Sequence, residues 1–175
     1  MILLMRHKTS VWNTEPKRCA GRTDIDLSAV GREQARRAGE VLPMPSAVYS
    51  SPLMRARDTA STVLIAIART TGRLRAPDID YDGRLQEADF GAWEGLYLSD
   101  IAKRWPEEWA SLARRDLSLV FPGGESLRAV RDRMAAALSE IRDRHGDEEL
   151  VLVVTHGTAL RALTASEGTR DPRSG

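Results

Sequence analysis

Two short runs of consecutive apolar residues each end at a histidine, and this feature constrains the fold more than any other. The first run, residues 2–5, is followed by Arg6 and His7, and the second, residues 151–154, is followed by a threonine and then His156. Strands that are apolar on successive residues are covered on both faces, as in parallel sheets. Ligands of open α/β sheets bind at the carboxyl ends of the strands. One such histidine is more often a polar strand terminus, but two of them predict a shared binding edge.

Helical patterns separate these runs, with weaker strand candidates at 47–49 and 79–81. Ser28 suits an N-cap, Pro52 suits a first helical turn and Gly146 suits a helix stop. Strands that alternate with helices predict an α/β layered fold with a largely parallel sheet. The expected helices cover residues 28–42, 52–71, 97–115 and 126–144.

Composition excludes several classes of protein. The 175 residues favour one compact domain, and 42% hydrophobic residues can form a core without metals or disulfides. The net charge of +1 and the scattered basic residues predict no nucleic-acid partner. No apolar run approaches the roughly 20 residues of a membrane span, so no membrane partner is expected. The single cysteine, Cys19, and the lack of a signal-peptide pattern predict a cytoplasmic globular protein.

Five motifs follow one another along the chain, at residues 4–13 (LMRHKTSVWN), 21–28 (GRTDIDLS), 50–60 (SSPLMRARDTA), 85–95 (LQEADFGAWEG) and 153–157 (VVTHG). In this order and spacing they resemble the motifs of the histidine phosphatase superfamily, the phosphoglycerate-mutase-like proteins. Each motif alone is a weak signal, but the five together make a strong one.

The resemblance covers residue 2 to about residue 165 and implies a fold and a domain organisation. The expected fold is a three-layer α/β/α sandwich with a mostly parallel central sheet and shortened C-terminal edge elements. The expected catalytic domain covers residues 1–165, with a helical cap over about 95–122 beside the pocket. Residues 166–175 are polar and are expected to form a flexible tail.

The resemblance also implies catalysis through a phosphorylated histidine. His7 corresponds to the nucleophile, and its phosphohistidine is discharged by water or by a second acceptor. A neutral imidazole is a competent nucleophile, and nearby cations help to keep it unprotonated. His156 corresponds to the residue that hydrogen-bonds the transferring phosphoryl group, and Glu87 to the acid that protonates the leaving oxygen. Asp89 and Glu94 are the rivals of Glu87 within the same loop.

Five further residues correspond to phosphate-binding positions of the family. Arg6 and Arg55 match its two arginines, whose planar guanidinium suits phosphate oxygens. Asn13 matches a polar contact to the phosphoryl group, and Gly21 matches a backbone contact to substrate. Gly157 lets the backbone approach an oxyanion closely.

One departure from the family pattern lies beside the nucleophile, where Lys8 and Thr9 replace Gly-Glu. Glycine there permits a tight turn with positive φ, a conformation that lysine adopts less readily. Lys8 could turn outward, add a cation at the pocket mouth or crowd His7. We expect altered substrate preference, with Lys8 and Ser10 as candidate specificity residues.

A second departure is the short segment after His156, where family members usually continue with a further helix and edge strands. An uncovered strand edge invites pairing with another chain, which makes a homodimer a candidate. Trp105 and Trp109 lie in the expected cap, and packing is the favoured role for them over substrate contact.

The leading hypothesis is a phosphomonoester hydrolase that acts on a small phosphorylated metabolite. The compact segments 90–95 and 121–126 resemble the phosphatase branch, which includes α-ribazole-phosphatase-like enzymes, more than the mutases. A phosphoglycerate-type mutase and a catalytically impaired phosphate-binding protein are the alternatives. The scheme requires no metal and no cofactor, and the sequence has neither a ligand-spaced Cys/His cluster nor a Walker-type loop.

Overall fold

A four-stranded parallel sheet forms the centre of the computed structural model, which describes residues 1–73 and 75–166. The strand order is β1-β4-β2-β3, and all paired strands are parallel. The predicted strands are confirmed, and three of the four extend one residue beyond the predicted end. They are β1 (Ile2–Arg6), β2 (Ala47–Ser50), β3 (Ile79–Tyr81) and β4 (Val151–Thr155).

The register of the sheet brings the two histidine-bearing strand ends together. Arg6 at the end of β1 lies opposite Thr155 at the end of β4, and Ser50 of β2 lies opposite Val154. Every residue of β4 is buried, as expected for a central strand that is covered on both faces. His7 and the residue after Thr155 therefore emerge side by side at one edge of the sheet.

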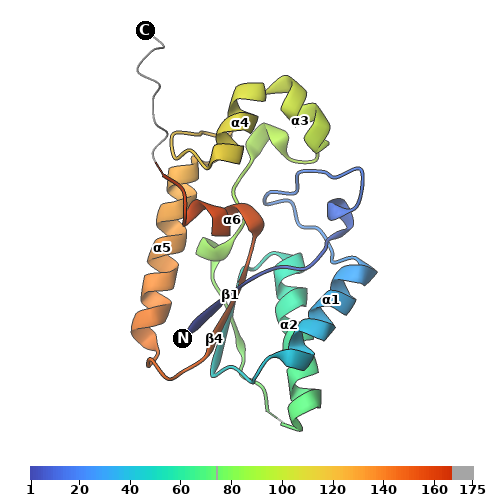
Figure 1. Cartoon of the computed structure of the whole chain (residues 1–175), viewed down its shortest axis with the longest axis vertical. Helices are drawn as coiled ribbons and strands as arrows, with labels where there is room; N and C mark the ends of the chain where they lie inside the picture. The colour runs from blue at the N-terminus through green and yellow to red at the C-terminus, as the bar shows by residue number, and fades with distance from the viewer. Residues whose placement is uncertain (74, 167–175) are drawn as a thin grey trace.

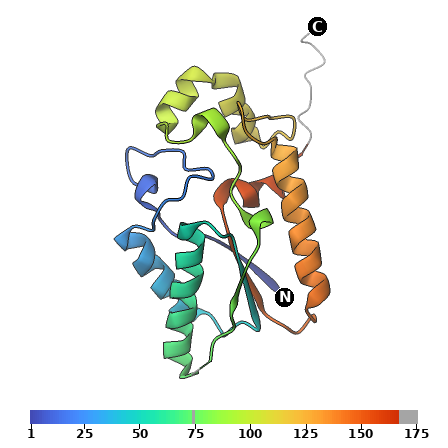
Figure 2. The ribbon, with the colours of Figure 1, turned by 180° about the vertical axis from the view of Figure 1, so that it is seen from behind.

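Helices cover both faces of the sheet and complete the expected three-layer α/β/α sandwich (Figure 1). One face packs against α1 (Ala29–Val41) and α2 (Met54–Thr71), which also pack closely on each other. The other face packs against α5 (Leu127–Arg144) and α6 (Gly157–Ala162). The view from behind shows the same separation, with α5 on one side of the strands and the α1–α2 pair on the other (Figure 2). No helix in the described part of the chain is long and apolar enough to cross a membrane.

The helix starts follow local capping chemistry. The Ser28 and Ser126 side chains accept hydrogen bonds from the third residue after each of them, so α1 and α5 begin where the sequence predicts. The start predicted for α2 was early, because Leu53 is its N-cap and Pro52 lies before the helix. Gly146 directly follows His145, the C-cap of α5, so the helix ends where expected.

The expected single helix over 97–115 is wrong, because the structure has two helices there. They are α3 (Leu98–Arg104) and α4 (Pro106–Arg114), and Trp105 between them has non-helical dihedral angles. Pro106 has no N–H with which to continue α3, but its fixed φ suits the first turn of α4. Both helices lie beyond the carboxyl ends of the strands (Figure 1).

Aromatic packing attaches these two helices to the rest of the domain. Trp93 is 1% exposed, and its ring centroid lies 6.2 Å from those of both Trp105 and Trp109 and 5.3 Å from that of Phe121. The packing role expected for Trp105 and Trp109 is therefore observed. Sequence periodicity did not predict α6 or the short helices η1 (Val11–Asn13), η2 (Gly83–Leu85) and η3 (Gly91–Trp93). Of the expected tail, all but Ser166 lies outside the described residues.

Candidate active site

His7 is the first residue after β1, and its surroundings favour a neutral ring. Its backbone N–H donates to Thr155 O at 2.8 Å, which continues the strand pairing. Nδ1 lies 2.7 Å from Lys8 O, and a carbonyl can only accept, so Nδ1 carries the proton and Nε2 has a free lone pair. Burial and the charges of Arg55 and Arg6 lower the pKa of His7 from its ordinary value of 6.5 to about 3. At neutral pH the ring is therefore neutral, with the lone pair of Nε2 available.

His156 lies beside His7, as the two-strand pattern predicts. The ring centroids are 5.1 Å apart, with an angle of 53° between the ring planes. Burial and the charge of Arg55 lower the pKa of His156 well below its ordinary value. Its Nε2 lies 2.8 Å from Ser51 Oγ, whereas its buried Nδ1 has no hydrogen-bond partner among the described residues. An unpartnered buried nitrogen is uncommon and typical of functional sites.

The two predicted phosphate-binding arginines differ in how free they are. Arg55 is 1% exposed, and its terminal nitrogens donate to Thr23 O at 3.0 Å and Gly21 O at 2.6 Å. Its Nε is buried without a partner among the described residues. Arg55 thus holds the loop of Gly21 and Thr23 and places its charge beside His7. Because its terminal nitrogens already donate to backbone carbonyls, they are only partly free for the expected bidentate contact with phosphate.

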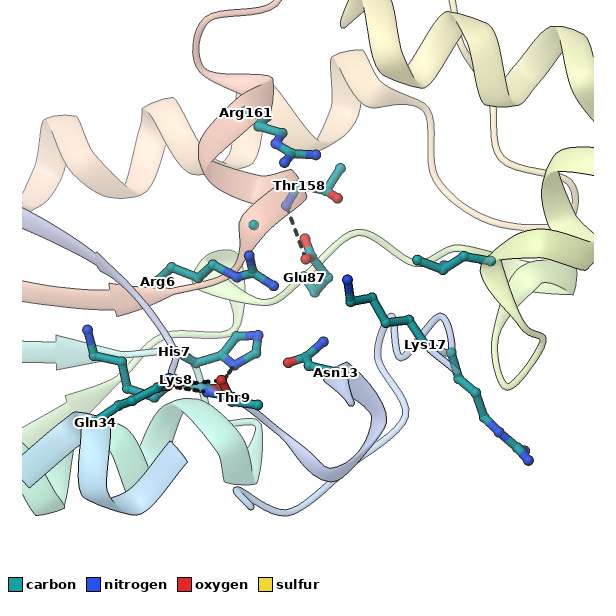
Figure 3. A pocket seen from close by; sticks show the side chains of 13 residues that line it. Arg6, His7, Lys8, Thr9, Asn13, Lys17, Gln34, Glu87, Thr158 and Arg161 are labelled. Carbon is teal, nitrogen blue, oxygen red and sulfur yellow. Dashed lines mark hydrogen bonds between the residues drawn. The ribbon is translucent and has the colours of Figure 1, made fainter. Parts of the chain in front are cut away.

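Arg6 reaches across the site toward Glu87 from the end of β1 (Figure 3). A Cβ added at Gly157 would lie 3.4 Å from Arg6 Cζ, so the absence of a side chain there lets the guanidinium pack over the start of α6. No hydrogen bond or ion pair of the Arg6 side chain occurs within residues 1–73 and 75–166. Its donors are available to an anion.

Glu87 is held against the start of α6. Its Oε1 accepts hydrogen bonds from Ala88 N at 3.0 Å and Ala159 N at 2.9 Å, and its Oε2 accepts one from Thr158 N at 3.1 Å. Oε2 therefore has one hydrogen-bond partner and Oε1 has two. The carboxylate lines the same cavity as His7.

The rival acids serve structural roles. Glu94 accepts hydrogen bonds from the backbone N–H groups of Arg22 and Thr23, and so joins the loop after η3 to the loop that follows Cys19. Asp89 accepts from Gly91 N within its own turn. Neither acid is among the described residues that line the cavities around His7.

Gly21 and Asn13 shape the loop that faces the two histidines. Gly21 has φ +51°, and a Cβ there would lie 2.0 Å from Glu94 Oε1, so the position requires glycine. Asn13 Oδ1 accepts from the backbone N–H and the hydroxyl of Ser10 at 3.0 and 2.9 Å. Ser10, a candidate specificity residue, is fully buried, and its hydroxyl is engaged in this contact.

The backbone at Lys8 does not take the positive φ that a glycine would permit there. Among the described non-glycine residues, only Arg115 has positive φ, so Lys8 occupies an ordinary conformation. Its backbone N–H donates to Thr59 Oγ1 at 3.0 Å, and the next residue, Thr9, donates to Gln34 Oε1 at 3.2 Å. The Lys8 side chain lines the cavity on the far side of His7 from Asn13 (Figure 3).

The cavity at this edge of the sheet has two parts. An outer part of about 600 Å³ and an inner part of about 170 Å³ share Arg6, His7 and Glu87 among their lining residues. Cys19 lines the inner part, and burial raises the pKa of its thiol to about 12, which makes it a poor rival nucleophile. Within the described ranges, no three histidine, cysteine, aspartate or glutamate side chains gather as they would around a metal ion.

Sequence reasoning missed five polar residues among the described residues that line the outer cavity. Arg161 lies four residues after Gly157 on α6, so helical spacing could have placed it on the same face as the site. Lys17 and Arg18 had no comparable sequence signal, since their positions depend on how the loop before Cys19 folds back over the site. The five are Lys17, Arg18, Gln34, Thr158 and Arg161.

Comparison with known proteins agrees with this geometry. Residues 2–173 match the histidine phosphatase superfamily (branch 1). The chain is 38% identical over 166 residues to the metal-independent phosphoserine phosphatase of Arabidopsis thaliana, covering 93% of this chain and 66% of that protein. It is 34% identical over 171 residues to the 2,3-bisphosphoglycerate-dependent phosphoglycerate mutase of Afipia carboxidovorans, covering 93% and 78% of the two chains.

A solved structure gives the same result for the fold. The mycobacterial glucosyl-3-phosphoglycerate phosphatase aligns with a TM-score of 0.78 and 32% identity, covering 92% of this chain and 77% of that one. The chain spans about two thirds of the length of the Arabidopsis phosphoserine phosphatase. The sequence match, the fold and the paired histidines agree, and the chain belongs to the histidine phosphatase superfamily.

Proposed function

We propose that the protein hydrolyses a small phosphomonoester through a phosphohistidine on His7. One observation carries the proposal: His7, whose Nε2 is unprotonated, lines a cavity that is rich in cations, and its ring centroid lies 5.1 Å from that of a second, fully buried neutral histidine. Phosphoryl transfer depends mainly on positioning and on stabilisation of charge. Arg6, Arg55 and His156 supply that stabilisation in our scheme, which uses no metal ion and no cofactor.

The first step transfers the phosphoryl group to the protein. His7 Nε2 forms a bond to phosphorus while the bond from phosphorus to the substrate oxygen breaks. Glu87 Oε2 gives its proton to that oxygen, so the alcohol leaves in neutral form. Asn13 and Gly21 contact the group from the loop side, and Gly157 from α6.

The second step restores the protein. A water oxygen attacks phosphorus, the bond to His7 Nε2 breaks, and Glu87 takes up the proton of that water. Inorganic phosphate leaves through the open outer cavity. The same two groups therefore serve both steps in opposite directions.

A mutase is the second candidate, because curated relatives at 34% identity are named 2,3-bisphosphoglycerate-dependent phosphoglycerate mutases. In that reaction a second hydroxyl of a phosphorylated acid takes the place of water. Product analysis separates the two reactions: after incubation with 3-phosphoglycerate, hydrolysis yields free phosphate, whereas a mutase yields the 2-phospho isomer.

Trapping the covalent intermediate tests the proposal. We expect acid quenching after incubation with a radiolabelled phosphomonoester to leave acid-labile label on the wild-type protein and none on His7→Ala. Lys103→Gln, which changes an exposed lysine of α3 away from the cavity, is the matched control and is expected to keep the label. If a panel of phosphomonoesters in excess leaves no label on the wild-type protein, the phosphate-binding alternative replaces the enzyme.

A further inference from the structure

The outer cavity carries more positive charge than one phosphoryl group neutralises. A phosphomonoester has about two negative charges near neutral pH. Arg6 and Arg55 are enough to balance them in the proposed reaction. The cavity wall holds four more cations and a single acid, Glu87. The four are Lys8, Lys17, Arg18 and Arg161.

Two of these cations enter the space around Glu87 from different elements. Lys17 extends from the loop before Cys19 toward Glu87, and Arg161 extends from α6 above Thr158 (Figure 3). Lys8 lies on the other side of His7 in the same view, away from this pair. Lys17 and Arg161 thus flank the position at which the leaving oxygen must meet Glu87.

Neither cation has a strong partner within the protein. No hydrogen bond or ion pair of the Arg161 side chain is found in the described ranges. Lys17 Nζ lies 2.8 Å from Glu15 Oε1, but these side chains are 51% and 77% exposed. Exposed ion pairs contribute little and exchange readily for a ligand. By contrast, Arg18 donates to Tyr97 Oη at 2.7 Å and lies over the Tyr97 ring, so it is committed to α3's N-cap.

The single acid of the wall cannot offset four cations, because one carboxyl group supplies at most one negative charge. Both oxygens of Glu87 already accept hydrogen bonds from backbone N–H groups, and the proposed reaction uses the carboxyl for proton transfer. The Lys17–Arg161 pair therefore presents donors and charge that the phosphoryl group at His7 leaves unused.

We propose that Lys17 and Arg161 form a second anion site, and that the substrate is a phosphomonoester whose leaving group carries its own anionic group, a carboxylate or a second phosphate. The proposal rests on the proposed function, because the phosphoryl group must occupy the space beside His7. The leaving oxygen then lies at Glu87, and the rest of the leaving group extends between the two cations. Charge-assisted hydrogen bonds to both cations select such a substrate over a neutral one of the same size.

Binding measurements on the full chain test the second site without turnover. Calorimetry with His7→Ala compares 3-phosphoglycerate with glycerol 3-phosphate, which has a hydroxymethyl group in place of the carboxylate. We expect the carboxylate ligand to bind about tenfold more tightly at low salt, and the preference to shrink as salt is added. The pair fructose 1,6-bisphosphate and fructose 6-phosphate tests a phosphate in place of the carboxylate.

Charge-removing variants then assign the preference to residues. In the His7→Ala background, Lys17→Gln with Arg161→Gln is expected to weaken binding of 3-phosphoglycerate about tenfold more than binding of glycerol 3-phosphate. Arg57→Gln and Lys103→Gln are the matched controls, because both cations lie outside the cavity wall, and they are expected to keep the preference. Glu15→Gln frees Lys17 from its competitor and is expected to increase the preference about threefold.

The outcomes separate this inference from the proposed function. Equal affinity for both members of each ligand pair, or equal weakening of both by the double variant, overturns the second anion site. Phosphate release by the wild-type protein is measured separately. Selective binding without phosphate release supports the anion site and contradicts hydrolysis, whereas hydrolysis with no binding preference contradicts only the anion site.

Discussion

At the scale of single residues, a backbone carbonyl decides which nitrogen of the His7 ring carries the proton. The motifs at 4–13 and 153–157 predicted from the sequence alone that His7 and His156 lie in one site. The tautomer could not be predicted, because it depends on where Lys8 O points in the folded chain. The φ of Lys8 could not be predicted for the same reason, since the glycine that the family uses there does not determine the backbone of a lysine in this chain.

The lowered pKa of His7 predicts a pH dependence of stability. Its pKa is about 3 in the folded protein against 6.5 ordinarily, mainly because of burial and the Arg55 charge. Between these values the unfolded chain binds a proton that the folded chain does not, so stability falls as pH drops below about 6.5. His7 contributes up to about 1.4 kcal/mol per pH unit to this slope.

Urea unfolding at several pH values from about 7 down to about 5 measures the slope. We expect the free energy of unfolding of His7→Gln to depend less steeply on pH than that of the wild-type protein by about this amount. Lys103→Gln, the control, is expected to retain the wild-type slope. Parallel slopes for wild-type and His7→Gln would mean that His7 is not held neutral by the fold.

Glu87 predicts a dependence on the leaving group. An acid matters most when the departing oxygen is a poor leaving group, and positioned acids contribute about 10²–10⁴-fold. We therefore expect Glu87→Gln to slow the transfer of the phosphoryl group from an alkyl phosphate to His7 by about 100-fold or more, and the transfer from p-nitrophenyl phosphate far less. Single-turnover release of the alcohol and of p-nitrophenol measures the two rates, because both report the first step and not the hydrolysis of the phosphohistidine. Equal losses on both would assign Glu87 a positioning role instead.

At the scale of elements, hydrophobic periodicity predicted the strands and the long helices but not their interruptions. Pro106 carried the signal that divides 97–115 into two helices, because proline starts a helix more readily than it continues one. The short helix α6 has too few residues for periodicity to show. The loop of Gly21 could not be predicted either, because the Glu94 carboxylate that holds it comes from a distant segment.

The geometry of the Gly21 loop predicts that alanine substitution destabilises the protein far more at Gly21 than at Gly83. At Gly21, φ is +51° and an added Cβ would lie 2.0 Å from Glu94 Oε1. Gly83 has ordinary φ, and nothing lies within 4 Å of its added Cβ. We expect Gly21→Ala to destabilise the protein by about 2 kcal/mol or more and to lower activity, and Gly83→Ala to change stability by less than about 0.5 kcal/mol. Chemical denaturation compares them, and similar values for both would contradict the role of Gly21.

At the scale of the whole molecule, the parallel register of the sheet assembles a site from segments that are far apart in the sequence. The ends of β1, β4 and β2 lie level, so His7, His156 and Ser51 meet although about 150 residues separate the first two. The two apolar runs that end at histidines were sufficient to predict this meeting. Of the cations of the outer cavity, Lys17, Arg18 and Arg161 were not predicted, because loops and the α6 face bring them there.

The exposed edge of β1 leads us to predict a homodimer, as the sequence suggested. Within the described residues β1 pairs with β4 alone, and Leu4 at its centre is 39% exposed. An open parallel edge with an apolar side chain favours association with a second copy.

We expect sedimentation equilibrium to show a dimer whose dissociation constant rises at least tenfold in Leu4→Lys, because dimerisation would bury the new charge. Val41→Lys, at an 81% exposed position at the end of α1, is the control and is expected to leave association intact. If both variants and the wild-type protein sediment as monomers at all concentrations, the β1 edge is not an interface between copies of this chain.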